Sequence, residues 1–261
     1  MKTERNVMKI EEILAERLER FSRNTLMSDE FLDFVSQNTQ PMETLMAYYR
    51  CAIREVQTKF EVLNEELSVQ YDRNPIESIK SRTKSLDSLI RKIRRKNLPM
   101  ALDSIEANIK DVAGVRVICS FTDDIYMLAE SFLRQDDIFL IEKKDYIKQP
   151  KENGYRSLHL IVEVPIFLKD ETRRMKVEVQ LRTIAMDFWA SLEHKLRYKK
   201  NIPNEYTEEL ARELKACAEE SARLDARMQQ VKNRLRDYEE PEQDGKSPFL
   251  LPLPMFLGMS E

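Results

Sequence analysis

The sequence predicts an α/β (α+β) fold in which a mixed sheet of about five strands is flanked by helices. Apolar residues recur at helical spacing in the N-terminal part of the chain, over 5–22 and 43–72. Short β-branched and apolar runs follow between residues 112 and 182, and helical spacing then returns through residue 238. Helices on both sides of a strand-rich middle favour one sheet with helices packed around it.

A third helix is expected to begin at Asn74 and Pro75, because asparagine is a favoured N-cap and proline is favoured in the first helical turn. Apolar residues at helical spacing extend this helix to about residue 96. In a chain of net charge −3, the basic residues on its outer face indicate a polyphosphate site or an RNA-facing patch, unless they form a solvated helix face. This basic cluster contains Lys80, Arg82, Lys84, Arg91, Lys92, Arg94, Arg95 and Lys96.

The middle of the chain is expected to supply the strands, over residues 112–121, 139–141, 158–166 and 175–182. The last two runs are expected to pair antiparallel, because a short charged turn joins them. Thr122 is a suitable N-cap for a helix over 123–135.

Two helices are expected to close the regular part of the chain, over 184–199 and 210–238. The second carries a seam that repeats about every 3.5 residues, the period of a helix that packs lengthwise on another helix. That partner helix could lie in the same subunit or in a second one. The seam consists of Leu210, Leu214, Cys217, Ser221, Leu224, Met228, Val231, Leu235 and Tyr238.

The chain is thus divided into three parts. Residues 1–40 are expected to form an N-terminal helical extension, and residues 41–240 are expected to form the main domain with its C-terminal helix. Residues 241–261 form a Pro-containing tail without a pattern, for which disorder is one interpretation.

Composition excludes several classes of protein. The chain has 261 residues but only four glycines, and it contains neither a Walker motif nor a dinucleotide-binding glycine motif. No apolar run approaches the length of a membrane span, and the N-terminus lacks the apolar core of a signal peptide. Cys51, Cys119 and Cys217 have no paired spacing, so we expect reduced thiols in a cytoplasmic protein.

Two short stretches carry most of the functional signal. Residues 176–183 read as a strand on which Glu178, Gln180 and Arg182 share one face, as alternate residues do. That face suits a ligand, although a half-exposed edge strand would look similar. Residues 153–159 favour the ligand, because they add an aromatic residue, an arginine and a histidine just after a glycine turn.

Asp111 and Glu178 are candidate metal ligands. Mg²⁺ takes oxygen ligands and bridges substrate phosphates. A strand-end carboxylate and a second carboxylate on another strand, together with a basic cluster, therefore describe a phosphoryl-transfer site. Each carboxylate alone could instead be a turn residue or a salt-bridge partner. The chain has only two histidines, His159 and His194, so a metal hydrolase site built on histidines is excluded. An exposed Tyr155 could stack on a nucleobase, or it could be a core residue.

Four segments in order resemble the synthetase domain of the Rel-type alarmone enzymes, and in particular the small alarmone synthetases of bacteria. They are NPIE…KSRTKS, IKDVAGVRVICSF, DYIKQPKENGYRSLHL and VEVQLRTIAMDFWASLEHK, and the likeness spans roughly 43–235. This family transfers pyrophosphate from ATP to the ribose 3′-hydroxyl of GTP or GDP, which gives pppGpp or ppGpp and AMP. The resemblance therefore implies a GTP diphosphokinase of the stringent response that only synthesises, since the histidine count does not fit the family's hydrolase domain.

The resemblance also implies roles for individual residues. Asp111 and Glu178 would bind Mg²⁺, and Glu178 would act as general base. ATP would be bound at its adenine by Arg82 and Arg116, and at its phosphates by Lys84, Arg94 and Arg95. GTP or GDP would be bound by Tyr155 stacking on guanine, by Lys151 and Arg156 at its phosphates, and by a pocket lined with His159, Gln180 and Asp187. A homotetramer is implied as well, and single-stranded RNA is a further possible partner.

Two other functions remain open at this stage. A nucleotidyltransferase usually carries a Gly-Ser turn before its acidic residues, and none of the four glycines here is followed by serine. An RNA-binding module would use the basic cluster and the aromatic residues, but it would need neither Mg²⁺ nor Glu178.

Overall fold

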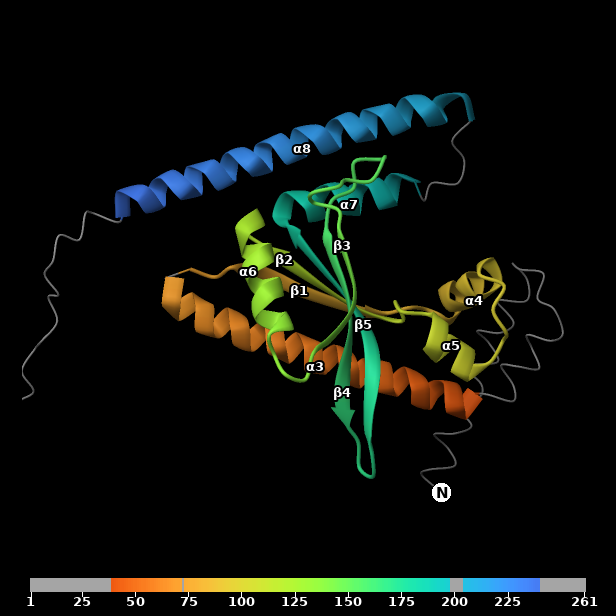
Figure 1. The fold of residues 1–261 in the computed structure, drawn as a ribbon. Coiled ribbons are helices and arrows are strands. Elements are labelled where there is room, and N and C mark those ends of the chain that lie inside the picture. The colour runs from red at the N-terminus through yellow and green to blue at the C-terminus, as the bar shows by residue number, and fades with distance from the viewer. Residues whose placement is uncertain (1–38, 72, 198–203, 240–261) are drawn as a thin grey trace, which may run out of the picture.

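A computed structural model describes residues 39–71, 73–197 and 204–239. The expected helix over 5–22 and the tail from 241 lie outside these residues. A five-stranded sheet lies at the centre, with helices around it (Figure 1). The elements are α3 (Thr39–Tyr71), β1 (Ile76–Thr83), α4 (Leu86–Arg95), α5 (Leu102–Asn108), β2 (Ala113–Cys119), α6 (Thr122–Leu133), β3 (Phe139–Asp145), β4 (Leu158–Phe167), β5 (Thr172–Thr183), α7 (Ile184–Arg197) and α8 (Asn204–Glu239).

The sheet is mixed, which confirms the predicted fold class. Its strand order is β1-β2-β5-β4-β3. β2 and β5 run parallel, and the other three neighbouring pairs are antiparallel, including the predicted pair β4 and β5. The parallel pairing of β2 with the central strand β5 therefore brings chain segments that are distant in sequence into register.

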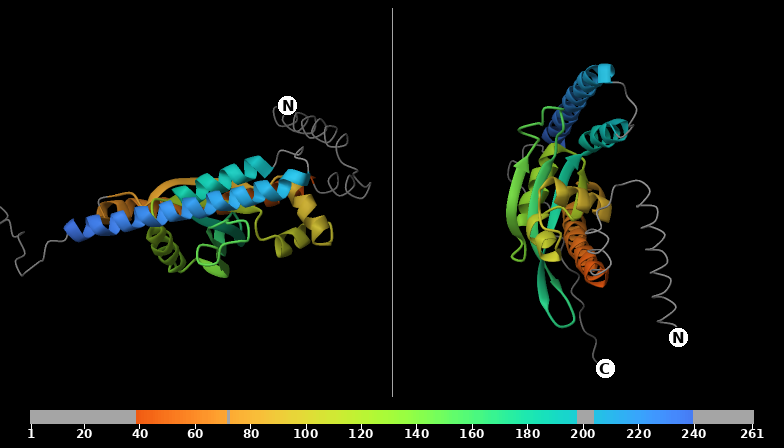
Figure 2. Two further views of the ribbon diagram at one scale, coloured as in Figure 1. Left: turned by 90° about the horizontal axis from the view of Figure 1, so that it is seen from above. Right: turned by 90° about the vertical axis from the view of Figure 1, so that its right-hand side faces the viewer.

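One face of the sheet is the apolar core. Alternate residues of β2, β4 and β5 are fully buried there, among them Val115, Leu160 and Val179. Helix α3 lies across this face (Figure 2). Helix α6 joins it, and the rings of Phe60 in α3 and Phe132 in α6 stack with their centroids 4.5 Å apart. Because strand side chains alternate, the other face is free to carry polar groups.

Helix α8 runs alongside α7 (Figures 1 and 2). The indole Nε1 of Trp189 donates to the Leu214 carbonyl at 2.8 Å, and Ala218 is buried in this contact. The seam predicted for this helix, in contrast, mostly points away from the subunit. Its exposed members are Leu210, Cys217, Leu224, Met228, Val231 and Leu235.

The prediction of a helix that begins near residue 75 is wrong for the first half of that helix. Residues 76–83 form β1, which pairs antiparallel with β2, and only residues 86–95 are helical. Ile76 and Ile79 are spaced as in a helix, but β1 is an edge strand, so most of its side chains face solvent and its alternation is weak. The actual N-cap is Ser85, whose side chain accepts from the Ser88 amide.

Two smaller differences concern neighbouring helices. Thr122 is the first residue of α6 rather than its cap, because Phe121 occupies the N-cap position and makes no side-chain cap bond. Helix α5 was not predicted, since its seven residues are too few for a periodic pattern. Within the described ranges, no helix combines the length and the apolar character needed to cross a lipid bilayer.

Candidate active site

The polar face of the sheet brings predicted site residues of four strands together. Arg82 of β1 lies opposite Gly114 of β2, which lies opposite Glu178 of β5. Two residues further along β2 and β5, Arg116 lies opposite Gln180. Gln180 in turn lies opposite His159 of β4. The predictions from residues far apart in sequence thus converge on one surface.

A hollow of about 90 Å³ opens on this face. Its floor is Gly114, so no side chain fills the space between Arg82 and Glu178. The hollow is bordered by Lys80, Ser81, Arg82, Val115, Arg116, Glu178 and Gln180.

Asp111 lies two residues before β2, the strand that contains Gly114. Its Oδ2 accepts from Lys84 Nζ at 2.8 Å and from Lys92 Nζ at 2.7 Å. Burial opposes ionisation, but the hydrogen bonds from both lysines outweigh it and hold the pKa of Asp111 below its ordinary value. Its Oδ1 is buried and has no partner among the described residues. Asp111 is therefore a carboxylate with one oxygen still able to bind a cation.

Glu178 is held at both of its oxygens. Oε1 lies 3.3 Å from His159 Nδ1, and Oε2 accepts from Gln180 Nε2 at 2.9 Å. Burial raises the pKa of Glu178, yet the contacts with His159 and Gln180 lower it below the ordinary value overall. The charge of Asp111 acts on the pKa of Glu178 in the raising direction, as expected for two carboxylates of one cleft.

The two carboxylates fit Mg²⁺ in number and chemistry. No cluster of three or more His, Cys, Asp or Glu side chains suitable for a metal exists within the described part of the chain. Mg²⁺ typically uses one or two carboxylates and completes its shell with water and substrate phosphates. The unpartnered Oδ1 of Asp111 provides a ligand atom of the right kind.

An aromatic cluster lies beside Glu178. The hydroxyl of Tyr155 is 2.8 Å from His159 Nε2, and the rings of Tyr146 and Tyr155 meet edge to face with centroids 6.0 Å apart. Lys151 Nζ lies 4.8 Å from the centre of the Tyr155 ring and 4.5 Å from that of Tyr146. Because Lys151 is exposed, its side chain can move away, and a nucleobase can then contact these aromatic rings.

Asp187, the predicted guanine contact, is surrounded by cations. Its Oδ1 accepts from Arg116 Nη1 at 3.1 Å and from Arg182 Nη1 at 3.2 Å, and its Oδ2 accepts from Lys80 Nζ at 3.2 Å. Asp187 stands at the start of α7, so this helix closes one side of the polar face. The carboxylate links Arg116 on the β2 side with Arg182 on the β5 side.

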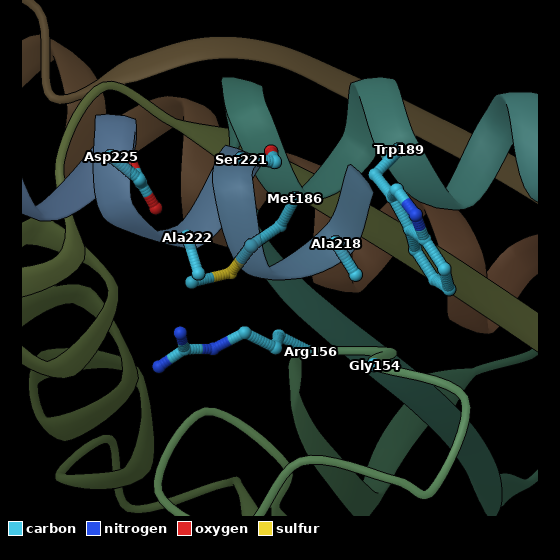
Figure 3. A pocket seen from close by; sticks show the side chains of 8 residues that line it. All are labelled: Gly154, Arg156, Met186, Trp189, Ala218, Ser221, Ala222 and Asp225. Carbon is cyan, nitrogen blue, oxygen red and sulfur yellow. The ribbon is translucent and has the colours of Figure 1, made fainter. Parts of the chain in front are cut away.

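Arg156 does not join the other site residues. Its Nη2 donates to the Ile147 carbonyl at 2.8 Å, and its side chain points into a small pocket beside α8 together with Asp225 (Figure 3). Burial raises the pKa of Asp225, and the Thr183 hydroxyl and the Arg156 charge offset part of this rise. The position of Arg156 thus gives no support to its predicted contact with acceptor phosphates.

Arg94 and Arg95 lie in the last turn of α4 with exposed side chains, while Lys92 of the same helix reaches Asp111. Lys92 belonged to the predicted basic cluster but was not singled out. Once residues 76–83 are assigned to a strand, Lys92 falls on the short helix that follows Lys84, and this assignment could have identified it. Lys80, Tyr146 and Arg182 were likewise not named as site residues.

The turn that carries Tyr155 rests on α8. Gly154 has φ +87°, a left-handed conformation, and a Cβ at this position would collide with the Cβ of Ala218. Gly154→Ala is expected to lower the free energy of unfolding by about 2–4 kcal/mol, through backbone strain and overpacking. Urea denaturation measures this change in the free energy of unfolding. Adding Ala218→Gly should restore only the part due to the collision, and an unchanged midpoint in Gly154→Ala would contradict the contact.

Comparison with known proteins agrees with this geometry. The pattern described as the region found in RelA/SpoT proteins matches residues 81–203. The chain is 45% identical over 184 residues to GTP pyrophosphokinase YwaC of Bacillus subtilis. This match covers 70% of this chain and 87% of YwaC. The chain belongs to the RelA/SpoT family, among its small alarmone synthetases.

Solved small alarmone synthetases share the fold. Small alarmone synthetase 1 from Bacillus subtilis, bound to its product pppGpp, aligns with a TM-score of 0.67 and 34% identity over 75% of this chain and 98% of that one. Small alarmone synthetase 2 from the same organism aligns with a TM-score of 0.66 and 42% identity over 75% of this chain and all of that one. The family resemblance drawn from four sequence motifs is confirmed.

Proposed function

We propose that this small alarmone synthetase is a GTP diphosphokinase, which transfers pyrophosphate from ATP to the ribose 3′-hydroxyl of GTP or GDP and releases AMP. The observation that carries the proposal is the position of Glu178 on the polar face, between a cationic end, which is the hollow bordered by Arg82 and Arg116, and an aromatic end, which is the cluster of Tyr155 and His159. The names of the relatives support the reaction, since YwaC is a GTP pyrophosphokinase and small alarmone synthetase 1 was solved with pppGpp.

The donor ATP is proposed to occupy the cationic end. Arg82 and Arg116 border the hollow, and planar guanidinium groups suit both stacking on adenine and hydrogen bonding to phosphate. Lys84 and Lys92 converge on Asp111, so phosphates placed beside Asp111 meet both ammonium groups. Arg94 and Arg95, at the exposed end of α4, remain predicted phosphate ligands.

We propose Mg²⁺ as the cofactor, held by Oδ1 of Asp111 and by Glu178. When bound, the ion supplies positive charge that neutralises charge developing on the transferred phosphates. Glu178 is ionised at neutral pH because its pKa is lowered, so it can accept the proton of the acceptor's 3′-hydroxyl. The 3′-oxygen then forms a bond to the β-phosphorus of ATP. The bond from that phosphorus to the α–β bridging oxygen breaks, and AMP leaves with this oxygen.

The acceptor nucleotide is proposed to occupy the aromatic end. Guanine would stack on Tyr155 after Lys151 moves aside, and Lys151 would then be free to meet the acceptor's phosphates. His159 and Gln180 hold both oxygens of Glu178, and this would aim the carboxylate at the ribose. Asp187 remains the predicted guanine contact, although three cations already bind it.

Tyr155→Ala is expected to weaken binding of GDP by about 1–3 kcal/mol, the usual worth of stacking between a base and an aromatic ring. Isothermal titration calorimetry with GDP measures the change. Binding of a non-hydrolysable ATP analogue is the internal control and should stay near the wild-type value. Unchanged affinity for GDP would show that guanine does not stack on Tyr155.

A product assay tests the proposed function. Purified protein with Mg²⁺, ATP and GTP should yield AMP and guanosine pentaphosphate in equal amounts, as read by ion-exchange chromatography. A nucleotidyltransferase would release pyrophosphate instead of AMP, and an RNA-binding module would form neither product. Either of those results would reject the proposal.

We also propose that the protein assembles as a homotetramer. A homotetramer is supported by exposed apolar rows on two helices, namely the seam residues of α8 and Ile184, Phe188, Leu192 and Leu196 of α7. Binding of single-stranded RNA and a cytoplasmic location stay predictions from sequence.

A further inference from the structure

Arg182 is the most enclosed charged group of the polar face. Only 4% of its surface is exposed, although it stands on the same strand and the same face as Glu178. Its guanidinium contacts three side chains. Nη1 donates to Asp187 at 3.2 Å, while Nη2 donates to the Tyr155 hydroxyl at 2.6 Å and to Gln180 Oε1 at 2.9 Å.

Two of these contacts continue to the catalytic carboxylate. Arginine can only donate, so the Tyr155 hydroxyl accepts from Arg182 and its own proton is free for His159 Nε2. The remaining ring nitrogen, Nδ1, then carries a proton toward Glu178 Oε1. In the second path, the Gln180 oxygen faces Arg182, so its amide nitrogen donates to Glu178 Oε2. One guanidinium nitrogen thus sets the hydrogen bonds at both oxygens of Glu178.

The third contact leads to the donor half of the cleft. Asp187 Oδ1 accepts from Arg182 and also from Arg116, which borders the hollow proposed for ATP. Desolvating a charge as deeply as Arg182 is costly unless a partner neutralises it, and Asp187 is that partner. A buried ion pair of this kind fixes positions, because neither group can move without leaving the other uncompensated.

We propose that Arg182 is a positioning residue that holds Glu178 in its reactive orientation, through Tyr155 and His159 on one path and through Gln180 on the other. The inference rests on the proposed function, because it assigns Arg182 a task in the same cleft. The task requires arginine, since two hydrogens on one planar nitrogen reach Tyr155 and Gln180 while the other nitrogen reaches Asp187. A lysine would keep the charge but could not hold all three acceptors in this fixed geometry.

Arg182→Lys tests the proposal, and Arg173→Lys is its matched control. Arg173 lies on the same strand, forms a two-point ion pair with Glu106 and stands 5.2 Å from the Tyr48 ring, but it faces the opposite side of the sheet. With ATP and GDP as substrates, Arg182→Lys should lower kcat by about tenfold to hundredfold, the cost of a misplaced reacting group. Affinity for a non-hydrolysable ATP analogue should change by less than about threefold, because Arg82, Lys84 and Lys92 remain. Arg173→Lys should stay within about twofold of wild type in kcat.

A double-mutant cycle separates positioning from general loosening of the fold. Tyr155→Phe keeps the ring but removes the hydroxyl, so it cuts one path while leaving Arg182 in place. If Arg182 acts through that hydroxyl, the double variant should lose less than the product of the two single losses in kcat. Losses that multiply, or a kcat for Arg182→Lys within about twofold of wild type, would overturn the proposal.

A thermal melt of each variant shows whether that variant is folded at the assay temperature. Should Arg182→Lys be unfolded at the assay temperature, Tyr155→Phe and Gln180→Met cut the two paths one at a time. Wild-type kcat in both of these variants would overturn the proposal, and a reduced kcat with unchanged affinity for the ATP analogue would support it. If wild-type protein itself releases no AMP from ATP and GDP, the proposed function fails first. An active wild type with an equally active Arg182→Lys variant rejects the positioning role alone.

Discussion

Replacing Glu178 with glutamine is expected to slow formation of AMP and alarmone by roughly 10²- to 10⁴-fold, the usual contribution of a general base. Glutamine keeps the shape of the side chain, so the contact with Gln180 or His159 can rearrange without a cavity. It cannot accept the 3′-hydroxyl proton, and it is a weaker ligand for a divalent cation. The rate of AMP release at saturating ATP and GDP measures the effect.

The binding of both nucleotides should survive this substitution. Glu178 is one of several groups around the cleft, and the cations that meet the donor phosphates lie on other elements. Glu163→Gln is a matched control, because Glu163 stands on the neighbouring strand β4 and on the same face of the sheet. Wild-type turnover in Glu178→Gln would remove Glu178 from the chemistry, whatever its position.

Asp111→Asn is expected to lower the turnover rate by about 10²- to 10³-fold, which corresponds to a loss of several kcal/mol of transition-state stabilisation. The substitution removes the carboxylate oxygen proposed to hold Mg²⁺. It also removes the negative charge with which Lys84 and Lys92 both pair. These two changes should act in opposite directions on nucleotide binding, and calorimetry can separate them.

Without Mg²⁺, a non-hydrolysable ATP analogue should bind Asp111→Asn more tightly than wild type, by up to about tenfold, because both ammonium groups are then free for phosphate. With Mg²⁺ the advantage should disappear or reverse. Asp170→Asn in the exposed β4–β5 turn is the control, since the Asp170 side chain is 83% exposed. Weaker binding of the analogue to Asp111→Asn in the absence of metal would contradict the lysine arrangement.

The strands were predictable where one face is buried. The pair β4 and β5 followed from alternation, because the apolar residues at every second position, such as Leu160 and Val179, enter the core. The strand β1 was not, because an edge strand with a mostly exposed surface loses the alternation that marks it. Its isoleucines then matched helical spacing by chance.

The sequence was enough to name most residues of the candidate site, but it did not show which side chains contact one another. Asp111, Glu178, Tyr155 and His159 were named from motifs. In the structure His159 contacts both Glu178 and Tyr155, and the charge of Asp111 acts on the pKa of Glu178. Arg156 was named with them, but it points toward α8, because successive residues near the start of a strand face opposite sides.

Arg182 illustrates what sequence alone could not provide. Its place on the ligand face followed from alternation with Glu178 and Gln180. Its hydrogen bonds depend on Tyr155 and Asp187, which arrive from a loop and from α7. Contacts between such distant segments are fixed by tertiary packing, and no single segment encodes them.

The most direct test of pyrophosphate transfer follows the phosphates of ATP. Two samples of ATP, one radiolabelled at the α-phosphate and one at the γ-phosphate, are incubated with the protein, Mg²⁺ and GDP. The γ-label should appear in the guanosine product and the α-label in AMP. An α-label in the guanosine product would indicate nucleotidyl transfer, and a γ-label released as free phosphate would indicate hydrolysis. Either result would contradict the assignment of Asp111 and Glu178 to pyrophosphate transfer.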